Sequence, residues 1–373
     1  MFLLSPNELM TKQNEKSLFP ILPSKSNFIG ILGGGQLGKM TAMAASRLGF
    51  PTSLYCPKGD NPAENVVTKV LHGSWDDFTK IEKFASDIIC ATSEFENVPS
   101  KVLDQISKKS SVSPNSFVFK TAQFRDKEKQ IASQAGFNVP KWFKIQSLQD
   151  LQKFSEQLDF NAILKTNSLG YDGKGQSIID SKSNLHKIWH QIDFLDCILE
   201  EKINFKREIS VLYAKSANQT ECFFPISENK HQKGILRTTS APAFVEEKTL
   251  RQIKKLTRNY AKLIKLTGLL TIEMFELKDG SILFNEIAPR PHNSYHWTIE
   301  GCQNSQFDIL IKCICGHSIS DESTYEKWEM KNIIGFEIND LKKHLMNKNY
   351  SCHVYGKKEV KPGRKMGHLT RKK

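Results

Sequence analysis

Hydrophobic and polar residues alternate on both sides of an Asp279-Gly280 pair, within residues 269–287. An Asp-Gly pair between two apolar runs is a strong signal for a two-residue β-hairpin turn. A turn centred there pairs residues whose numbers have the same sum. The predicted pairs, all on one face because strand side chains alternate with a period of two, are Leu277 with Ile282, Phe275 with Phe284 and Glu273 with Glu286.

Glu273 and Glu286 carry the first chemical signal. Two carboxylates directly opposite each other repel, and an apolar neighbourhood increases the repulsion unless a positive group lies between them. Two such oxygen ligands, with Asn285 beside them, suit Mg²⁺ that also carries substrate phosphates. The pattern leaves an equal alternative, in which the register is off by one or one Glu sits at a solvated strand end. The polar run at residues 288–296, directly after a buried strand, favours a binding site.

Residues 28–56 have the pattern of a strand, a glycine-rich turn, a helix and a second strand. The turn, Gly33 to Gly38, fits GxGxxG and predicts an anionic ligand at the helix N-terminus. A dinucleotide-binding fold would place an acid after the second strand, but that strand ends at Cys56-Pro57. The sequence therefore disfavours NAD and keeps an anion site. A tight turn that only packs is the alternative.

Two further segments place polar residues after short apolar strands. Glu94 and Glu96 follow a predicted strand at residues 87–92, where open α/β sheets bind ligands. The alternative there is a helix N-terminus, at which acids are favoured. Lys165 ends another strand and precedes the glycine-rich loop 170–176, which fits a flexible cover for phosphates or a mobile hairpin tip.

Three longer segments are predicted to be helices. Residues 116–136 are rich in Lys and Arg and closed by Gly136, and residues 148–158 and 246–267 have apolar residues at helical spacing, the last closed by Gly268. His231 is placed in a loop, where a lone histidine is more often structural than functional. Near the end of the chain, two glycine turns carry basic residues that could form a phosphate clamp. These basic residues are Lys357, Arg364 and Lys365.

Composition narrows the class of protein. The chain has 373 residues, 39% hydrophobic and 25% charged, which is ordinary for a globular protein of two or three domains. No apolar run reaches the length of a membrane span. Eight scattered cysteines indicate a reducing cytoplasm. The net charge of +13 invites a nucleic-acid partner, but the basic residues are spread over the chain, and small anionic substrates explain the charge equally well.

Six segments in order carry a resemblance to a known family. They read GILGGGQLGKM, SEFENVP, LKTNSLGYDGKGQ, FKREISV, FNEIAPRPHNS and YGKKEVKPGRKMGH. Together they resemble the N5-carboxyaminoimidazole ribonucleotide synthetases, ATP-grasp enzymes of purine biosynthesis. The resemblance extends from about residue 28 to residue 368. Each motif alone is weak to moderate, and six in one order are very specific.

The resemblance implies an α/β and α+β fold. It places a Rossmann-like, biotin-carboxylase-like domain at residues 28–120, and an ATP-grasp domain at 121–310 with a mobile lid subdomain at about 145–205. A small C-terminal domain would occupy 311–373. Residues 1–27 are expected to be a poorly ordered polar leader without the features of a signal peptide. The resemblance also implies a homodimer, and it leaves open whether the product passes directly to a downstream mutase.

The implied reaction is the carboxylation of 5-aminoimidazole ribonucleotide by bicarbonate, driven by ATP through carboxyphosphate, which gives N5-carboxyaminoimidazole ribonucleotide, ADP and phosphate. ATP and Mg²⁺ are the implied cofactors, and the partners are small molecules rather than nucleic acid or membrane. Such chemistry holds the amine close to the activated carbon and shields it from water.

The resemblance also assigns residues. The implied ATP contacts are Arg125, Lys165, Gly170, Tyr171, Asp172, Gly173, Lys174, Gly175, Gln176, Glu200, Glu201, Lys202, Ile203, Glu208, His231, Asn285 and Glu286. The implied contacts to the ribonucleotide are Gly34, Gly35, Gln36, Leu37, Glu94, Tyr171, Asp172, Arg290, His292, Lys357, Arg364 and Lys365. The implied metal ligands are Glu273 and Glu286, and the implied catalytic residues are Lys165, Arg290 and His292, with His292 as the candidate base.

Two departures from the family pattern are visible. Tyr295 stands where the family has a glycine, and Tyr cannot adopt every backbone shape open to Gly. Residues 166–169 lack an Arg that often precedes the glycine loop. Three other functions compete: a different ATP-grasp carboxylase or ligase, an NAD-dependent oxidoreductase based on GxGxxG, and a basic nucleic-acid-binding protein.

Overall fold

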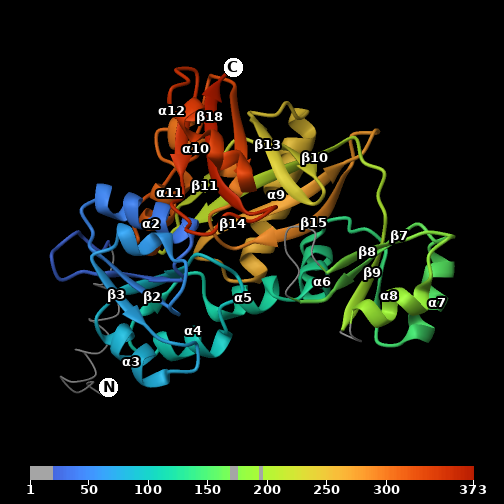
Figure 1. Ribbon diagram of the computed structural model, residues 1–373, viewed down its shortest axis with the longest axis horizontal. Helices are drawn as coiled ribbons and strands as arrows, with labels where there is room; N and C mark the ends of the chain where they lie inside the picture. Colours follow the sequence, from blue (N-terminus) through green and yellow to red (C-terminus); the bar gives the residue numbers. More distant parts are fainter. Residues whose placement is uncertain (1–19, 169–174, 193–195) are drawn as a thin grey trace, which may run out of the picture.

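The computed structural model describes residues 20–168, 175–192 and 196–373. Within them the strands form three sheets, which occupy different regions of the molecule in Figure 1. Among the described helices, none has the length and apolar character needed to cross a membrane.

The N-terminal domain is a parallel sheet with strand order β3-β2-β1-β4-β5. Its inner strands are continuously buried, as expected for a parallel sheet covered by helices. The carboxyl ends of these strands meet at one edge, where a site can form. The elements are β1 (Ile29–Leu32), α2 (Gln36–Arg47), β2 (Thr52–Cys56), η1 (Pro62–Asn65), β3 (Lys69–His72), α3 (Phe78–Ser86), β4 (Cys90–Ser93), α4 (Ser100–Ile106) and β5 (Ser111–Val112).

A second, antiparallel sheet of four strands has the order β6-β9-β7-β8. It has its own hydrophobic core and lies to one side of the rest of the chain in Figure 1, with its helices outermost. Its elements are β6 (Trp142–Ile145), α7 (Leu148–Gln157), β7 (Ala162–Thr166), β8 (Gln176–Ile179), α8 (Leu185–Gln191) and β9 (Cys197–Glu201).

The largest sheet runs β15-β14-β10-β12-β13-β16-β18-β17, with β11 paired to β10. Helices α6 and α9 pack against one of its faces in a shared core. The elements before the C-terminal segment are α5 (Ser116–Ala122), α6 (Arg125–Ala135), β10 (Arg207–Lys215), β11 (Glu221–Phe223), β12 (Ser227–Gln232), β13 (Ile235–Ala241), α9 (Glu247–Leu263), β14 (Gly268–Glu276), β15 (Ile282–Ala288), η2 (Asn293–Tyr295), α10 (Thr298–Gly301) and α11 (Gln306–Ile314).

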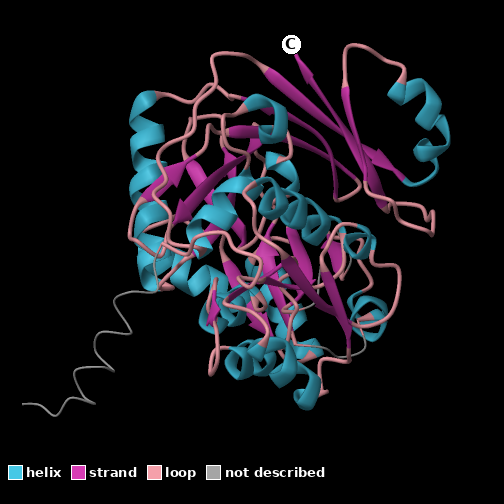
Figure 2. Cartoon of the chain, turned by 90° about the vertical axis from the view of Figure 1, so that its left-hand side faces the viewer, coloured by secondary structure: helices cyan, strands magenta, loops and turns pink. Residues whose placement is uncertain are grey.

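The C-terminal strands continue this sheet instead of forming one of their own, because β16 pairs directly with β13. Figure 2 shows the end of the chain at the tip of the resulting ribbon of strands. The C-terminal strands are thereby part of the same sheet as β10, β12 and β13. Their elements are β16 (Trp328–Ile334), η3 (Gly335–Asp340), α12 (Leu341–Leu345), β17 (Ser351–Val354) and β18 (Lys365–Lys372).

The predicted hairpin forms, but its register differs from the prediction. The backbone N–H of Leu277 donates to the Ser281 carbonyl at 2.9 Å, so the turn has three residues, with Gly280 at a φ of 81°. Phe284 therefore pairs with Met274 and faces the core, which corrects the predicted Phe275–Phe284 and Leu277–Ile282 pairs. A β-bulge at Asn285 then shifts the register back by one residue.

Three other element predictions are wrong in detail. The single helix predicted over 116–136 is two helices, because Gln123 donates its amide to the carbonyls of Glu96 and Val98, and Phe124 is extended. Helix α9 ends at Leu263, and Gly268, with a φ of 111°, begins β14 instead of closing the helix. His231 lies on β12 and not in a loop.

The expected disorder of residues 1–27 does not hold for its last part. Ile21 is 6% exposed and belongs to the core that includes α2 and α11. Its backbone N–H donates to Cys315 at 2.8 Å, and its carbonyl contacts His317 at 2.7 Å. Residues 20–27 therefore pack against the end of α11, whereas residues 1–19 lie outside the described part of the chain.

Candidate functional site

A cavity of about 940 Å³ lies where the three sheets and the loop between β17 and β18 meet. The residues that line it come from segments that are far apart in the sequence. It gathers most of the residues that the sequence assigned to a site. The assigned residues that line it are Gln36, Leu37, Glu94, Arg125, Lys165, Gln176, Glu208, His231, Glu273, Asn285, Glu286, Arg290, His292, Lys357, Arg364 and Lys365.

Glu273 and Glu286 are directly opposite each other on β14 and β15, as predicted. His292 Nε2 lies 2.9 Å from Glu273 Oε1, and Arg125 Nη1 lies 3.0 Å from Glu286 Oε2. Burial alone would raise the pKa of Glu273, but the neighbouring His292, then His231 and Lys365, lower it to about 2. The carboxylate therefore stays ionised inside the protein, next to a second carboxylate.

Glu208 and His231 form a second acid–base pair on the same wall. His231 Nδ1 lies 2.6 Å from Glu208 Oε2, across β10 and β12. Burial would lower the pKa of His231, but the hydrogen bond to Glu208 and the charge of Glu273 outweigh burial and raise it. The two sheet strands thus fix the position of both side chains.

Lys165 reaches the cavity from β7 and is held from behind by a buried carboxylate. Its Nζ lies 2.5 Å from Glu200 Oε2 on the neighbouring strand β9. The other oxygen of Glu200 is ion-paired with Lys129 from α6, a residue that the sequence analysis did not assign. Burial alone would raise the pKa of Glu200, but Lys165 and then Lys129 lower it to about 2.

The glycine-rich turn before α2 holds an anion, but the anion belongs to the protein. Glu94 Oε1 accepts the backbone N–H of Gly35 at 2.5 Å, and Oε2 accepts that of Gly38 at 2.9 Å. A Cβ at position 35 would collide with this carboxylate, so a larger residue there would displace Glu94 from the turn. Burial raises the pKa of Glu94 despite these hydrogen bonds. Glu94 thus occupies the N–H groups of Gly35 and Gly38, whereas Gln36 and Leu37 of the same turn line the cavity.

Glu96 forms an ion pair with the guanidinium group of Arg290. Both Glu96 oxygens accept from Arg290, one of them at 3.0 Å, in a bidentate pair. Burial would raise the pKa of Glu96, and the Arg290 charge lowers it. The pair joins the N-terminal domain to the segment after β15, so Glu94 and Glu96 have different roles.

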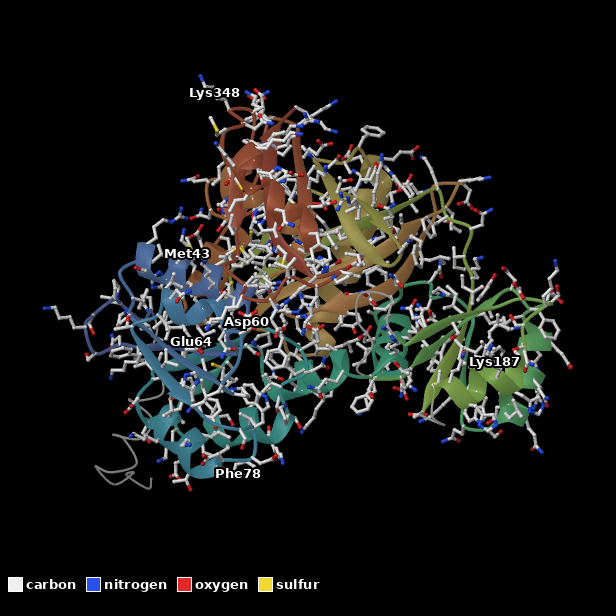
Figure 3. The ribbon with its side chains drawn as sticks, viewed as in Figure 1. Met43, Asp60, Glu64, Phe78, Lys187 and Lys348 are labelled. Atoms are coloured by element: carbon white, nitrogen blue, oxygen red, sulfur yellow. The ribbon has the colours of Figure 1, made fainter. Side chains whose placement is uncertain are left out.

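The loop between β17 and β18, with the first residue of β18, brings three basic residues to the cavity: Lys357, Arg364 and Lys365. Arg364 Nη1 lies 2.9 Å from Asp60, and Asp60 also accepts the backbone N–H of Lys358 at 3.0 Å. Asp60, labelled in Figure 3, thereby fixes the loop against the N-terminal domain. Burial, and then the charge of Arg364, lowers the pKa of Lys357 to about 8. Positive groups that lower one another's pKa in this way form a site that favours a bound anion.

Several assigned residues lie elsewhere. Gly34 and Gly35 form the turn around Glu94, and Gly175 accepts the Thr166 N–H at 2.9 Å beside the start of β8. Glu201 and Lys202 are exposed at the end of β9, with Ile203 half-buried after them. The remaining glycine-loop residues lie outside the described part of the chain, namely Gly170, Tyr171, Asp172, Gly173 and Lys174.

Tyr295, the departure from the family pattern, causes no strain. It lies in η2, outside the positive-φ residues, and its ring is fully buried. Its hydroxyl donates to the Ser210 carbonyl at 2.7 Å and accepts the Leu212 N–H at 3.0 Å. The ring thus anchors the segment that carries His292 to strand β10.

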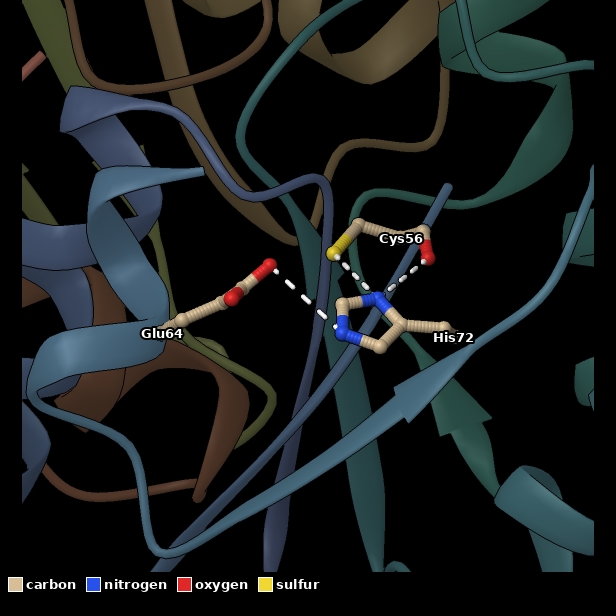
Figure 4. A group of neighbouring side chains, drawn as sticks. All are labelled: Cys56, Glu64 and His72. Atoms are coloured by element: carbon tan, nitrogen blue, oxygen red, sulfur yellow. Dashed lines mark hydrogen bonds and ion pairs between the residues drawn. The ribbon is translucent and has the colours of Figure 1, made fainter. Parts of the chain in front are cut away.

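A group of Cys56, Glu64 and His72 in the N-terminal domain is a possible alternative metal centre within the described residues. Figure 4 shows that the two ring nitrogens of His72 point to different partners. Nδ1 lies 3.9 Å from Cys56 Sγ, and Nε2 lies 3.7 Å from Glu64 Oε1. Burial raises the pKa of the Cys56 thiol to about 12. The protonated thiol is a poor metal ligand, and the contacts of His72 with Cys56 and Glu64 account for the group without a metal.

Three family models match the chain in succession. The ribonucleotide synthetase preATP-grasp domain matches residues 27–123, and the ATP-grasp domain matches residues 130–307. The phosphoribosylaminoimidazole carboxylase C-terminal domain matches residues 329–372.

Curated relatives match nearly the whole chain. The N5-carboxyaminoimidazole ribonucleotide synthase of Brucella melitensis is 36% identical over 345 residues, covering 92% of this chain and 95% of that protein. The enzyme of the same name from Bacillus subtilis is 35% identical, covering 92% and 90%. A bifunctional purine synthesis protein of Dictyostelium discoideum is 36% identical, and there the chain spans 37% of the relative's length.

Solved structures agree with this similarity. An ADP complex of an N5-carboxyaminoimidazole ribonucleotide synthetase superposes with a TM-score of 0.90 at 33% identity, covering 95% of this chain and 93% of that one. The Aspergillus clavatus synthase, in complex with ADP and 5-aminoimidazole ribonucleotide, gives 0.84 at 27% identity, covering 93% and 94%.

Proposed function

The chain belongs to the N5-carboxyaminoimidazole ribonucleotide synthase family of ATP-grasp enzymes, and from this we propose that it uses ATP to join bicarbonate to the amine of 5-aminoimidazole ribonucleotide. ATP transfers its terminal phosphoryl group to bicarbonate, giving carboxyphosphate and ADP. Carboxyphosphate releases phosphate and CO₂, and the amine attacks CO₂ and loses a proton. The product is N5-carboxyaminoimidazole ribonucleotide.

One observation carries this proposal. A single cavity has paired carboxylates at one wall and a cluster of Lys357, Arg364 and Lys365 at another. The first arrangement suits a metal–nucleotide complex, and the second suits the phosphate of a ribonucleotide. The two substrates would therefore meet in a shared, largely enclosed space, as an unstable intermediate requires.

The oxygen donors present fit Mg²⁺. Glu273 and Glu286 face each other across adjacent strands, and the bulge brings Asn285 to the same edge of the cavity. Hard carboxylate and amide oxygens are what this ion prefers. We assign the two carboxylates as its ligands, and when bound it would neutralise charge on the nucleotide phosphates.

The chain's own residues supply the remaining steps. Lys165 offers a positive point charge to the phosphates, with Arg125 and the Glu208–His231 pair on the same side. Arg290, held by Glu96, also lines the cavity and would offer its positive charge to an anion such as bicarbonate. His292, 2.9 Å from Glu273, is our proposed base for the amine proton.

The competing oxidoreductase has no comparable support. The donors that would hold a dinucleotide pyrophosphate are used by Glu94. The cytoplasmic location remains a proposal, which the eight free thiols support. The homodimer also remains a proposal. Hand-off to a mutase rests on the family alone.

The test is phosphate release from ATP in the presence of bicarbonate, with and without 5-aminoimidazole ribonucleotide. We expect release to depend on the ribonucleotide and N5-carboxyaminoimidazole ribonucleotide to form in equal amount. Phosphate release that does not depend on the ribonucleotide, or that depends on another amine or carboxylate, would reject this substrate assignment and favour a different ATP-grasp ligase.

A further inference from the structure

Lys129 is a buried cation that does not line the cavity. It lies on α6 and is 2% exposed, among the largest fully buried side chains in the described part of the chain. Its Nζ is ion-paired with Glu200 and lies 3.4 Å from the carbonyl oxygen of Asn285. Lys129 therefore touches both β9, behind Lys165, and the bulge beside Glu286.

Glu200 is shared between two lysines. One carboxylate oxygen faces Lys129, and the other lies 2.5 Å from Nζ of Lys165. The side chains of Glu200, Lys129 and Lys165 are at most 9% exposed, so water screens their charges little. Burial lowers the pKa of Lys129, and the charge of Glu200 opposes this shift. With both lysines protonated, the three groups together carry one net positive charge, and Lys165 is the member that reaches the cavity.

Removing one lysine would change that sum. Without Lys129, the negative charge of Glu200 would cancel the charge of Lys165, and the cavity would face a neutral pair. Stability alone does not explain such an arrangement, because a buried ion pair replaced by apolar groups is often neutral or even stabilising. A functional role for Lys129 is the better explanation, because its charge leaves the positive charge of Lys165 uncancelled.

We propose that Lys129 is a positioning residue that neutralises Glu200, so that the full positive charge of Lys165 acts on the phosphates of the bound nucleotide. This inference rests on the proposed function for the location of the nucleotide. Lys129 also donates toward the Asn285 carbonyl, which ties the orientation of Lys165 to the strand that carries the metal ligands.

The first measurement is the affinity for Mg²⁺–ADP by titration calorimetry, which needs no imidazole substrate. We expect Lys129→Met to weaken binding about tenfold, as the loss of one charge contact implies. Lys127→Met is the matched control, since Lys127 lies on the same helix but is exposed and contacts the ring of Phe124. Lys129→Arg keeps the charge and should recover most of the affinity.

The second measurement separates electrostatics from folding. In the double variant Lys129→Met with Glu200→Gln, Lys165 again carries an uncancelled charge, so affinity should return to within about threefold of the parent, with Glu200→Gln alone completing the cycle. Unchanged affinity in Lys129→Met, or a double variant weaker than Lys129→Met, would overturn the proposal. Failure of the parent to bind ADP at all would instead reject the proposed function.

Discussion

The hydroxyl of Tyr295 lies 2.7 Å from the carbonyl oxygen of Ser210 and accepts the backbone N–H of Leu212, so one buried phenol bonds two residues of a central strand. Tyr295→Phe leaves the N–H and the carbonyl without this partner. We expect a loss of about 1–3 kcal/mol in the free energy of unfolding. Chemical denaturation measures it, and an unchanged value would show that the hydroxyl is dispensable.

Glu286→Gln tests the paired carboxylates. The amide keeps the shape of the side chain but not its charge, and the ion pair with Arg125 is lost. We expect turnover to fall about a hundredfold or more, because charge stabilisation by a bound metal is worth several kcal/mol. Circular dichroism should show an intact fold.

The matched control for this variant is Glu247→Gln, an exposed carboxylate on α9 that pairs only with Arg251 among the described residues. It should keep full activity. If Glu286→Gln were equally active, the carboxylate pair would be structural, and the metal assignment would have to move.

Arg364→Ala tests the basic loop. Arg364 belongs to the cationic end of the cavity, far from the paired carboxylates in role and in sequence. We expect KM for the ribonucleotide to rise about tenfold, the value of one charge-assisted hydrogen bond, with KM for ATP within about twofold. Steady-state kinetics with each substrate varied in turn gives both constants.

The control for the loop variant is Lys348→Ala, which removes an exposed charge at the far tip of the C-terminal segment (Figure 3). It should change neither constant. Equal effects of Arg364→Ala on both substrates would contradict the assignment of this loop to the ribonucleotide.

Lys357 predicts a pH dependence. Its pKa is lowered by burial, and then by Arg364, to about 8, so its charge is lost as the pH rises through that value. A neutral amine binds a phosphate poorly, so kcat/KM for the ribonucleotide should fall above about pH 8. The same shift opposes folding of the charged form below pH 8, and this cost shrinks as the pH rises.

Lys357→Arg supplies the comparison, since arginine stays charged across this range. The fall in kcat/KM above pH 8 should disappear in the variant. A fall that persists with the same midpoint would assign the ionisation to another group.

The sequence was sufficient to place the carboxylate pair but not to describe how it arises. An Asp-Gly turn predicted a two-residue loop, and the actual three-residue loop shifted every later pair by one. The bulge at Asn285 cancelled the shift before Glu286. Two register shifts in opposite directions cannot be predicted from the pattern of apolar residues, because that prediction assumes one register throughout a hairpin.

Lys129 and Glu94 show why the rest of the site could not be predicted. Lys129 lies in a helix rich in basic residues, and its burial depends on Glu200, which lies 71 positions later in the chain. Glu94 fills the glycine turn because a neighbouring strand delivers it there. Periodicity reports which face of an element is apolar, but not which distant charge that face will meet.

The bulge at Asn285 also limits how this hairpin can change in length. Deleting or inserting one residue within the paired segment Ile282–Asn285 would rotate every later side chain of β15 to the opposite face, so that Glu286 would turn away from Glu273. A second change of opposite sign in the same stretch would restore function. Variation in the length of this segment should therefore occur in compensated pairs, and a library of single-residue insertions and deletions should be almost entirely inactive there while remaining tolerant in the exposed turn before β17.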